Sequence, residues 1–469
     1  MVIVLMTLSI CHSMPGAITS LVIEVFTDDS YNVNPYVDRA HNSNVPARTE
    51  CFHPPRRAVI KNMADRLNFG LSRELWLVEI GIFLNYLGYG AVLPFEIIYL
   101  HNARGFSLSI AGLVVAMLSG IAVVIAPLAG PLIDRFGARA IATVAGVTLA
   151  LGYAGMAFAG SPIMAFIAAA LAGAGNGALS PSQSTLIATL ATPDLRHRAT
   201  AVSRVATNAG IGIGSALGGL IAAYGLTGYI ALFLANAITY LIYVFILVAV
   251  VRNDVRPEPI AGGYRTVFRD KAFVHLALTN VAIIAVGWGV FTWLVPPYAE
   301  NQIGLSTGLI GFLLLANAFT VVAVQVPVAR FAEGRRRTVM MALAASIFVG
   351  ACLLVIVAGL KSEIAYAALI TASVAVAFGE CFYTAVLMPL VAELAPAGLR
   401  GRYMASMGLS WWMGLALAPT LGTPILGHAP MVVFLAAALV AMAAAISVLA
   451  LEWRLPEASR LTPHPQGRS

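Results

Sequence analysis

Charged residues are scarce in this sequence. Asp, Glu, Lys and Arg together make up 10% of its 469 residues, whereas a soluble globular domain carries about 25%. Hydrophobic residues supply 59%, and the mean hydropathy is +0.86. A chain with so few charges cannot cover a water-exposed surface, so we expect a polytopic membrane protein.

The sequence also lacks the motifs of common enzymes. It has no P-loop, no H-E-x-x-H zinc motif, no G-x-S-x-G nucleophile elbow and no stretch of soluble-domain length that could bind a nucleotide. Its four cysteines have neither metal-ligand nor redox spacing. We therefore predict that the chain is not an enzyme, holds no metal or cofactor, and does not pump by hydrolysing ATP itself. The net charge of +7 comes mainly from loops between apolar runs, which favours membrane orientation over nucleic-acid binding.

Residues 1–65 differ from the remainder. The opening stretch is apolar, but it lacks a basic start and is interrupted by polar and helix-breaking residues, so it makes a poor signal peptide and a poor span. Residues 27–57 are polar and have no hydrophobic period. We expect a disordered N-terminal extension or a mis-assigned start, with Met63 as an alternative first residue.

Twelve apolar runs follow, each long enough to cross a bilayer, which takes about 20 residues. They cover residues 75–100, 107–133, 138–159, 162–190, 199–224, 227–251, 272–298, 306–329, 338–360, 364–391, 401–426 and 430–452.

The runs fall into two groups of six on either side of a polar segment. This predicts an N-terminal half, a cytoplasmic linker, a C-terminal half and a cytoplasmic tail, at residues 66–251, 252–271, 272–452 and 453–469. Lys and Arg collect in the linker and in alternate loops, while the other loops hold only Arg104 and Lys361. Because basic loops stay on the cytoplasmic side, both termini are expected to be cytoplasmic.

The two halves repeat each other in sequence. Six residues recur with an offset of 199 positions: Gly88, Gly90, Tyr99, Gly105, Ser107 and Gly112 reappear as Gly287, Gly289, Tyr298, Gly304, Ser306 and Gly311. Chance matching of glycines is the alternative, but a shared register that includes Tyr and Ser argues against it. A parallel repeat of this kind places a ligand site between the halves, near the middle of the membrane.

A short charged turn joins the second and third runs. Its pattern, G-x-x-x-D-R-x-G-x-R, is formed by Gly130, Asp134, Arg135, Gly137 and Arg139. An anchored hairpin turn would explain the glycine and the arginines, but it needs no Asp beside its Arg. Between two spans, the pattern resembles the loop between helices 2 and 3 of the major facilitator superfamily. The resemblance implies an all-α integral membrane fold of twelve transmembrane helices in two parallel six-helix repeats, with this loop acting in conformational gating.

The fifth run contains a glycine-rich pattern, G-x-x-x-G-S-x-x-G-G, with glycines at Gly210, Gly214, Gly218 and Gly219. It resembles the antiporter motif of facilitator exporters, in which Pro stands at the position of Ser215. Such a run forms a groove for close helix packing, and generic small-residue packing is the alternative. The proline occurs instead in the second half, as Pro419. The family's usual arginine in the fourth span is absent between residues 169 and 177, so the coupling mechanism stays open.

Ionisable residues inside spans are rare, and each is a functional hypothesis by default. Glu380 lies in the middle of the tenth run and is the first candidate for a proton carrier; a neutral, hydrogen-bonded carboxyl that holds helices together is the alternative. Glu96 and Glu79 are further candidates. Glu79, Arg204 and His275 lie near the cytoplasmic ends of their runs, where their side chains could reach the interface.

Polar and aromatic residues in central spans could line a cavity for an amphiphilic ligand. The candidates are Asn85, Tyr89, Asn208, Trp288, Tyr383 and Trp411. Any one of the aromatic residues could equally serve in packing or at the membrane interface.

Together these features predict a multi-pass secondary transporter of the cell (inner) membrane, whose partners are the lipid bilayer, protons and a small-molecule substrate. It would export small amphiphilic compounds in exchange for protons. An uptake symporter or uniporter for a metabolite, or a non-transporting sensor of the same fold, are the alternatives.

Overall fold

The computed structural model describes residues 71–192, 195–251, 264–396 and 399–462. The chain divides into two units, residues 1–62 and 63–469, and the description concerns the second. The predicted N-terminal extension, residues 252–263 of the predicted linker and residues 463–469 of the predicted tail lie outside the described residues.

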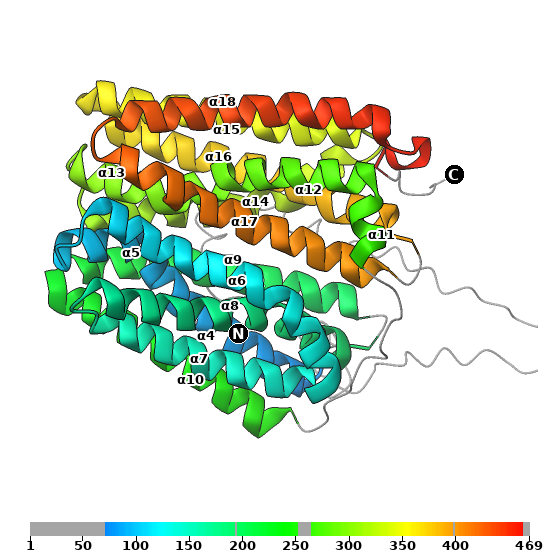
Figure 1. Cartoon of the computed structure of the whole chain (residues 1–469), viewed down its shortest axis with the longest axis horizontal. Helices are drawn as coiled ribbons and strands as arrows, with labels where there is room; N and C mark the ends of the chain where they lie inside the picture. Colours follow the sequence, from blue (N-terminus) through cyan, green and yellow to red (C-terminus); the bar gives the residue numbers. More distant parts are fainter. Residues whose placement is uncertain (1–70, 193–194, 252–263, 397–398, 463–469) are drawn as a thin grey trace, which may run out of the picture. The chain divides into compact units, whose positions relative to one another are not determined.

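Helices account for nearly all of the described chain, and its only β-type pairing is one isolated bridge. The first half contains α4 (Arg73–Val92), the 3₁₀ turn η1 (Leu93–Phe95), α5 (Glu96–Ile98), the π turn η2 (Tyr99–Ala103), α6 (Leu108–Phe136), α7 (Ala138–Ala157), α8 (Pro162–Leu190), α9 (Arg196–Ala222) and α10 (Gly225–Val250) (Figure 1). The second contains α11 (Tyr264–Arg269), α12 (Lys271–Ile284), the π-helical η3 (Ala285–Leu294), α13 (Val295–Asn301), α14 (Thr307–Ala332), α15 (Arg337–Leu360), α16 (Ala365–Leu394), α17 (Arg400–Leu426) and α18 (Pro430–Leu451). The predicted all-α fold is confirmed.

Eleven helical segments are long and apolar enough to cross a membrane among the described residues. They account for every expected run except the eleventh. That run is helical too, because α17 extends over 27 residues, or about 40 Å at 1.5 Å per residue. Two prolines, several hydroxyl side chains and the Trp411-Trp412 pair make it more polar than the other spans.

The sequence repeat reappears as repeated local structure. Gly105 and Gly304 both adopt positive φ, at 74° and 79°, which glycine does at little cost. Two residues later, Ser107 and Ser306 each begin a helix, and their hydroxyls accept hydrogen bonds from the N–H groups of the third residue onward. The repeated residues therefore mark the same turn and helix start in both halves.

Prolines interrupt the first span of each half. Pro94 lies in η1, between α4 and α5, and Pro296 and Pro297 lie at the start of α13 after η3. Proline has no N–H to continue the helical hydrogen-bond ladder, which accounts for the 3₁₀ and π turns beside these positions. The first and seventh spans therefore each consist of several helical pieces.

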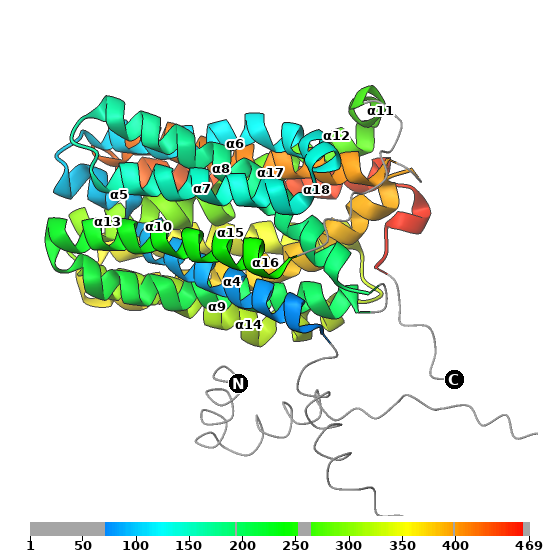
Figure 2. The same ribbon diagram turned by 90° about the horizontal axis from the view of Figure 1, so that it is seen from below.

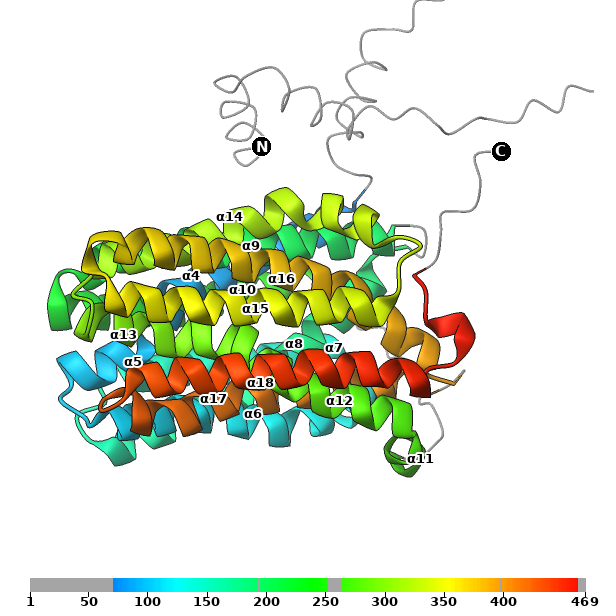
Figure 3. The ribbon, with the colours of Figure 1, turned by 90° about the horizontal axis from the view of Figure 1, so that it is seen from above.

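Two pairs of helices make the main contacts between the halves. α9 packs along α14, and α6 packs along α17 (Figures 2 and 3). Under the repeat, α6 corresponds to α14 and α9 to α17, so the two interfaces are equivalent. The halves also meet at the end opposite the basic loops, where Asn102 Nδ2 donates to Asn301 Oδ1 at 2.8 Å. Those two asparagines are themselves separated by the repeat offset of 199 positions.

Candidate functional site

The glycine pattern of the fifth run places α9 in backbone contact with α4. A Cβ atom at Gly214 would lie 2.1 Å from the Leu87 carbonyl oxygen, and one at Gly218 would lie 2.3 Å from that of Ala91. At Gly210 the corresponding distance, to Phe83, is 2.9 Å. These positions thus have no room for a larger side chain.

The opposite side of the same helix faces the second half. A Cβ atom at Gly219 would lie 2.4 Å from the Thr307 carbonyl oxygen of α14, and the Thr307 hydroxyl donates to the Gly219 carbonyl at 2.9 Å. Its glycines therefore allow α9 to pack closely against α4 of its own half on one side and against α14 of the second half on the other side.

Ser215 stands where the resembling motif has proline. Its buried hydroxyl lies 2.9 Å from the Gly90 carbonyl of α4 and 2.8 Å from the Ile211 carbonyl of its own helix. The helix is continuous from Arg196 to Ala222, so serine keeps an unbroken helix and adds a polar contact to α4. Its counterpart, Pro419, lies inside the continuous α17.

Glu380 lies on α16 within a group of residues from both halves. Asn317 of α14 and Trp288 of η3 lie within reach of its carboxylate, and Arg204 of α9 is close enough to attract it electrostatically. Glu380 and Arg204 form no ion pair shorter than 4.0 Å. As a whole residue Glu380 is half-buried, whereas Arg204 is exposed.

Arg204 is exposed, so the structure is compatible with the expectation that its side chain reaches the interface. The same side chain also attracts Glu380 of the other half electrostatically. A charged residue two turns into a spanning helix is a functional candidate by default. This position of Arg204 in the fifth run is the feature of the sequence that points to a functional role.

Glu96 occupies a sealed aromatic site near the end opposite the basic loops. It is 3% exposed, and the Tyr153 hydroxyl of α7 donates to its Oε1 at 3.4 Å. Trp293 of η3 lies beside the same carboxyl, although its indole N–H makes no hydrogen bond of sound geometry. Tyr153 stacks on Tyr240 at 5.8 Å and packs edge-on against Tyr89 at 6.5 Å between ring centroids.

Glu79 does not reach the interface, contrary to the sequence-based expectation. Its side chain is 2% exposed and accepts a hydrogen bond from the Ser203 hydroxyl of α9. Its second carboxylate oxygen forms no hydrogen bond with any residue that the structure describes. Ser203 and Arg204 are neighbours on α9. Ser203 contacts Glu79 of the first half, whereas Arg204 attracts Glu380 of the second half.

The predicted cavity residues separate into two groups. Trp288 packs against Trp411 at 4.8 Å and against Tyr383 at 6.3 Å between ring centroids. These three aromatic residues therefore belong to the same group as Glu380. Tyr383 is fully buried and donates to Asn280. Trp288 and Trp411 remain half-buried.

The other predicted cavity residues lie apart from this group. Tyr89 belongs to the aromatic cluster of Glu96, and Asn85 is 1% exposed in the core of the first half. Asn208 is half-buried and donates to the Arg204 carbonyl of its own helix at 2.9 Å.

The charged turn between α6 and α7 lies at the basic end of the bundle. Gly130 is exposed within α6, and Gly137 separates the two helices with φ of 89°. Arg139 donates to the Val248 carbonyl of α10 at 2.9 Å. Asp134 is half-buried, Arg135 is exposed, and Asp134 forms no ion pair with any described residue.

A comparison with known protein families identifies the superfamily of this chain. The sequence pattern of the Major Facilitator Superfamily matches residues 78–306 and, in a second match, 277–468. The chain belongs to this superfamily. It is a multi-pass membrane transporter of a family whose members are not enzymes.

Individual relatives are more distant. A Bacillus subtilis protein described as the uncharacterised MFS-type transporter YttB is 27% identical over 367 residues, covering 76% of this chain and 89% of the relative. The multidrug resistance protein MdtH of Aeromonas hydrophila is 25% identical over 358 residues, covering 74% and 85%. MdtH of Salmonella typhimurium is 27% identical over 344 residues, covering 72% and 81%.

Solved structures share the fold. A D-xylose-proton symporter superposes with a TM-score of 0.68 at 15% identity, over 82% of this chain and 99% of that one. The peptide transporter POT in complex with sulfate gives 0.67 at 16% identity, over 83% and 96%.

Proposed function

We propose that this facilitator exports small amphiphilic compounds from the cytoplasm in exchange for protons, by alternating access of a site between its halves. The observation that supports the proposal is the electrostatic attraction between Glu380 on α16 and Arg204 on α9, which belong to different halves. An ionised Glu380 attracts Arg204, whereas a protonated Glu380 does not. Proton binding thereby changes the free energy of an arrangement of the two halves, which is what coupling requires.

Arg204 supplies a cation that the fourth span lacks. In the family pattern an arginine of that span is linked to coupling, and none occurs between residues 169 and 177. Arg204 reaches the coupling carboxylate from the neighbouring fifth span. Asn317 and Trp288 would hold the carboxyl when it is protonated, because both can hydrogen-bond it.

The substrate class follows from the surroundings of Glu380. The half-buried indole rings of Trp288 and Trp411 give an apolar surface beside a single carboxylate. A flat apolar compound with a positive or hydrogen-bonding group would suit this surface. The similarity to MdtH multidrug resistance proteins supports the same class.

We further propose that the protein lies in the cell (inner) membrane with both termini cytoplasmic. The basic loops between α6 and α7, α8 and α9, and α14 and α15 lie at the same end of the bundle as α11. The positive-inside tendency places that end in the cytoplasm. Asp134 and its neighbours would then regulate opening on the cytoplasmic side.

Everted membrane vesicles test the proposal directly. When the vesicle lumen is acidified, an exporter should accumulate a fluorescent amphiphilic cation inside, and a protonophore should release it. An uptake symporter would instead expel its substrate from an acid lumen. Accumulation that ignores the proton gradient, or that requires an alkaline lumen, contradicts the proposal.

A further inference from the structure

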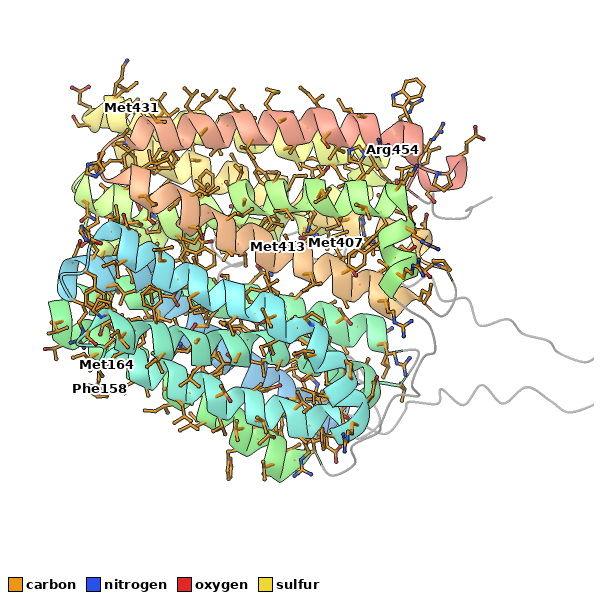
Figure 4. All side chains as sticks on the ribbon, viewed as in Figure 1. Phe158, Met164, Met407, Met413, Met431 and Arg454 are labelled. Atoms are coloured by element: carbon orange, nitrogen blue, oxygen red, sulfur yellow. The ribbon has the colours of Figure 1, made fainter. Side chains whose placement is uncertain are left out.

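A pocket lies at the basic end of the second half, where α12 begins and α18 ends. Its volume is about 250 Å³. Figure 4 labels Arg454 just after α18, at the same end of the bundle as the short helix α11 of Figure 1. Its wall is made by Phe268, Lys271, Val274, His275, Leu278 and Arg454.

The charged side chains of this wall are both cationic. Lys271 and Arg454 are exposed, and neither forms an ion pair with a described residue. The neighbouring carboxylates lie outside the wall: Asp270 caps α12 and accepts from Tyr403, and Glu452 pairs with Arg336. Among the described residues, the wall itself therefore carries two cations and no carboxylate.

Beside this charge the wall is apolar and open. Phe268 is 62% exposed and Leu278 is 65% exposed. Leu278 lies two turns beyond Lys271 on α12, about 10 Å further along the axis. His275 fills the space between them, with Nε2 held 2.9 Å from the Ser447 hydroxyl of α18.

A neighbouring tryptophan indicates the level of the membrane surface. Trp453 is 87% exposed, immediately before Arg454, and tryptophan is favoured where headgroups meet hydrocarbon. A Trp453 side chain at that level would place the cationic end of the pocket at headgroup depth and Leu278 beside the acyl chains.

We propose that this pocket binds an anionic phospholipid of the cytoplasmic leaflet. The lipid phosphate would lie between Lys271 and Arg454, and an acyl chain would pass over His275 to Leu278. Lys and Arg at this depth attract anionic headgroups. Free phosphate would satisfy the two charges but not the apolar wall. The proposal depends on the membrane orientation and not on proton-coupled export.

Native mass spectrometry of the intact protein released from mixed phosphatidylglycerol and phosphatidylcholine micelles tests the site. Wild type should retain a phosphatidylglycerol molecule in preference to phosphatidylcholine. The Lys271→Ala/Arg454→Ala variant should lose this preference by about 30-fold, since each cation near the surface is worth about fivefold in binding. The charge-keeping variant Lys271→Arg/Arg454→Lys should retain it, which separates loss of the site from loss of folding.

Two controls complete the experiment. Arg196→Ala/Arg330→Ala removes two exposed cations from the same end of the bundle, outside the pocket, and should leave the retained lipid unchanged. An equal loss in this control would overturn the proposal, as would equal retention of phosphatidylcholine by wild type. Displacement of the lipid by excess inorganic phosphate would show a simple anion site and would also overturn it.

Discussion

Glu96 and Glu380 are both carboxylates within spanning segments, yet their surroundings differ sharply. Glu96 is sealed by aromatic rings and hydrogen-bonded by Tyr153. Glu380 is half-buried as a residue, and Arg204 of the other half attracts its carboxylate. A proton carrier must exchange its proton with water and transmit its charge to a moving partner. The comparison teaches that burial alone does not identify such a group.

The repeat sharpens this contrast. With the offset of 204 positions that relates Leu190 to Leu394 at the ends of α8 and α16, Glu380 corresponds to Asn176. Both follow a glycine, Gly175 or Gly379. One half therefore places a titratable group where the other places a neutral amide, so the two structurally similar halves are chemically unequal.

The largest effect on transport is expected for Glu380→Gln. Glutamine keeps the shape but cannot release a proton, so proton-driven accumulation in everted vesicles should fall about tenfold or more, while substrate exchange without a gradient persists. The matched variant Glu96→Gln should keep most of the proton-driven activity. Wild-type pH dependence in Glu380→Gln would transfer the coupling role to Glu96.

A second test concerns the glycines of α9. Gly218→Leu should lower stability by about 3 kcal/mol, because its side chain would meet the Ala91 backbone of α4. Gly120→Leu is the control, since nothing lies within 4 Å of a Cβ atom there. Thermal unfolding in detergent measures both, and equal destabilisation would mean that α9 has no special packing surface.

At the basic end of the bundle, substitutions in the two halves should lower the free energy of unfolding by different amounts. Arg337 is fully buried and its Nη2 lies 2.5 Å from Glu393 Oε1, whose side chain is 37% exposed. Glu393→Ala would leave the guanidinium without its counter-ion and should cost about 2 kcal/mol, below the usual range for a fully buried pair. In the first half, Arg139→Ala should cost less than about 1 kcal/mol. Chemical unfolding of both variants provides the comparison, which fails if Arg139→Ala proves the more damaging.

The smallest effect is expected for Asp134→Asn. If Asp134 faces a helix N-terminus when the cytoplasmic side closes, loss of its negative charge should reduce transport about twofold to fivefold. Membrane insertion should be unaffected, as judged by the amount of folded protein. Unchanged transport at equal expression would remove the gating role from this residue.

The sequence predicted the helices more fully than the site. Long apolar runs and the 199-residue offset specify which segments span and repeat, since hydropathy and turn chemistry are local properties. The joining of Glu380 with Arg204, and of Glu79 with Ser203, depends on how α9 packs between the halves. Pairwise proximity across the bundle leaves no mark in a single sequence. The same reason explains why the sealed environment of Glu96 became visible only in the structure.

The end of the described chain also has a consequence for biogenesis. Residues after α18 return to the loop between α14 and α15, where Arg337 N–H donates to the Arg460 carbonyl at 2.9 Å and Thr462 N–H donates to the Arg335 carbonyl at 3.0 Å. Leu461 forms the isolated bridge with Arg336. These partners are synthesised more than a hundred residues after the loop. During translation the first half can finish its packing early, whereas the basic end of the second half stays incomplete until residues 460–462 have been synthesised.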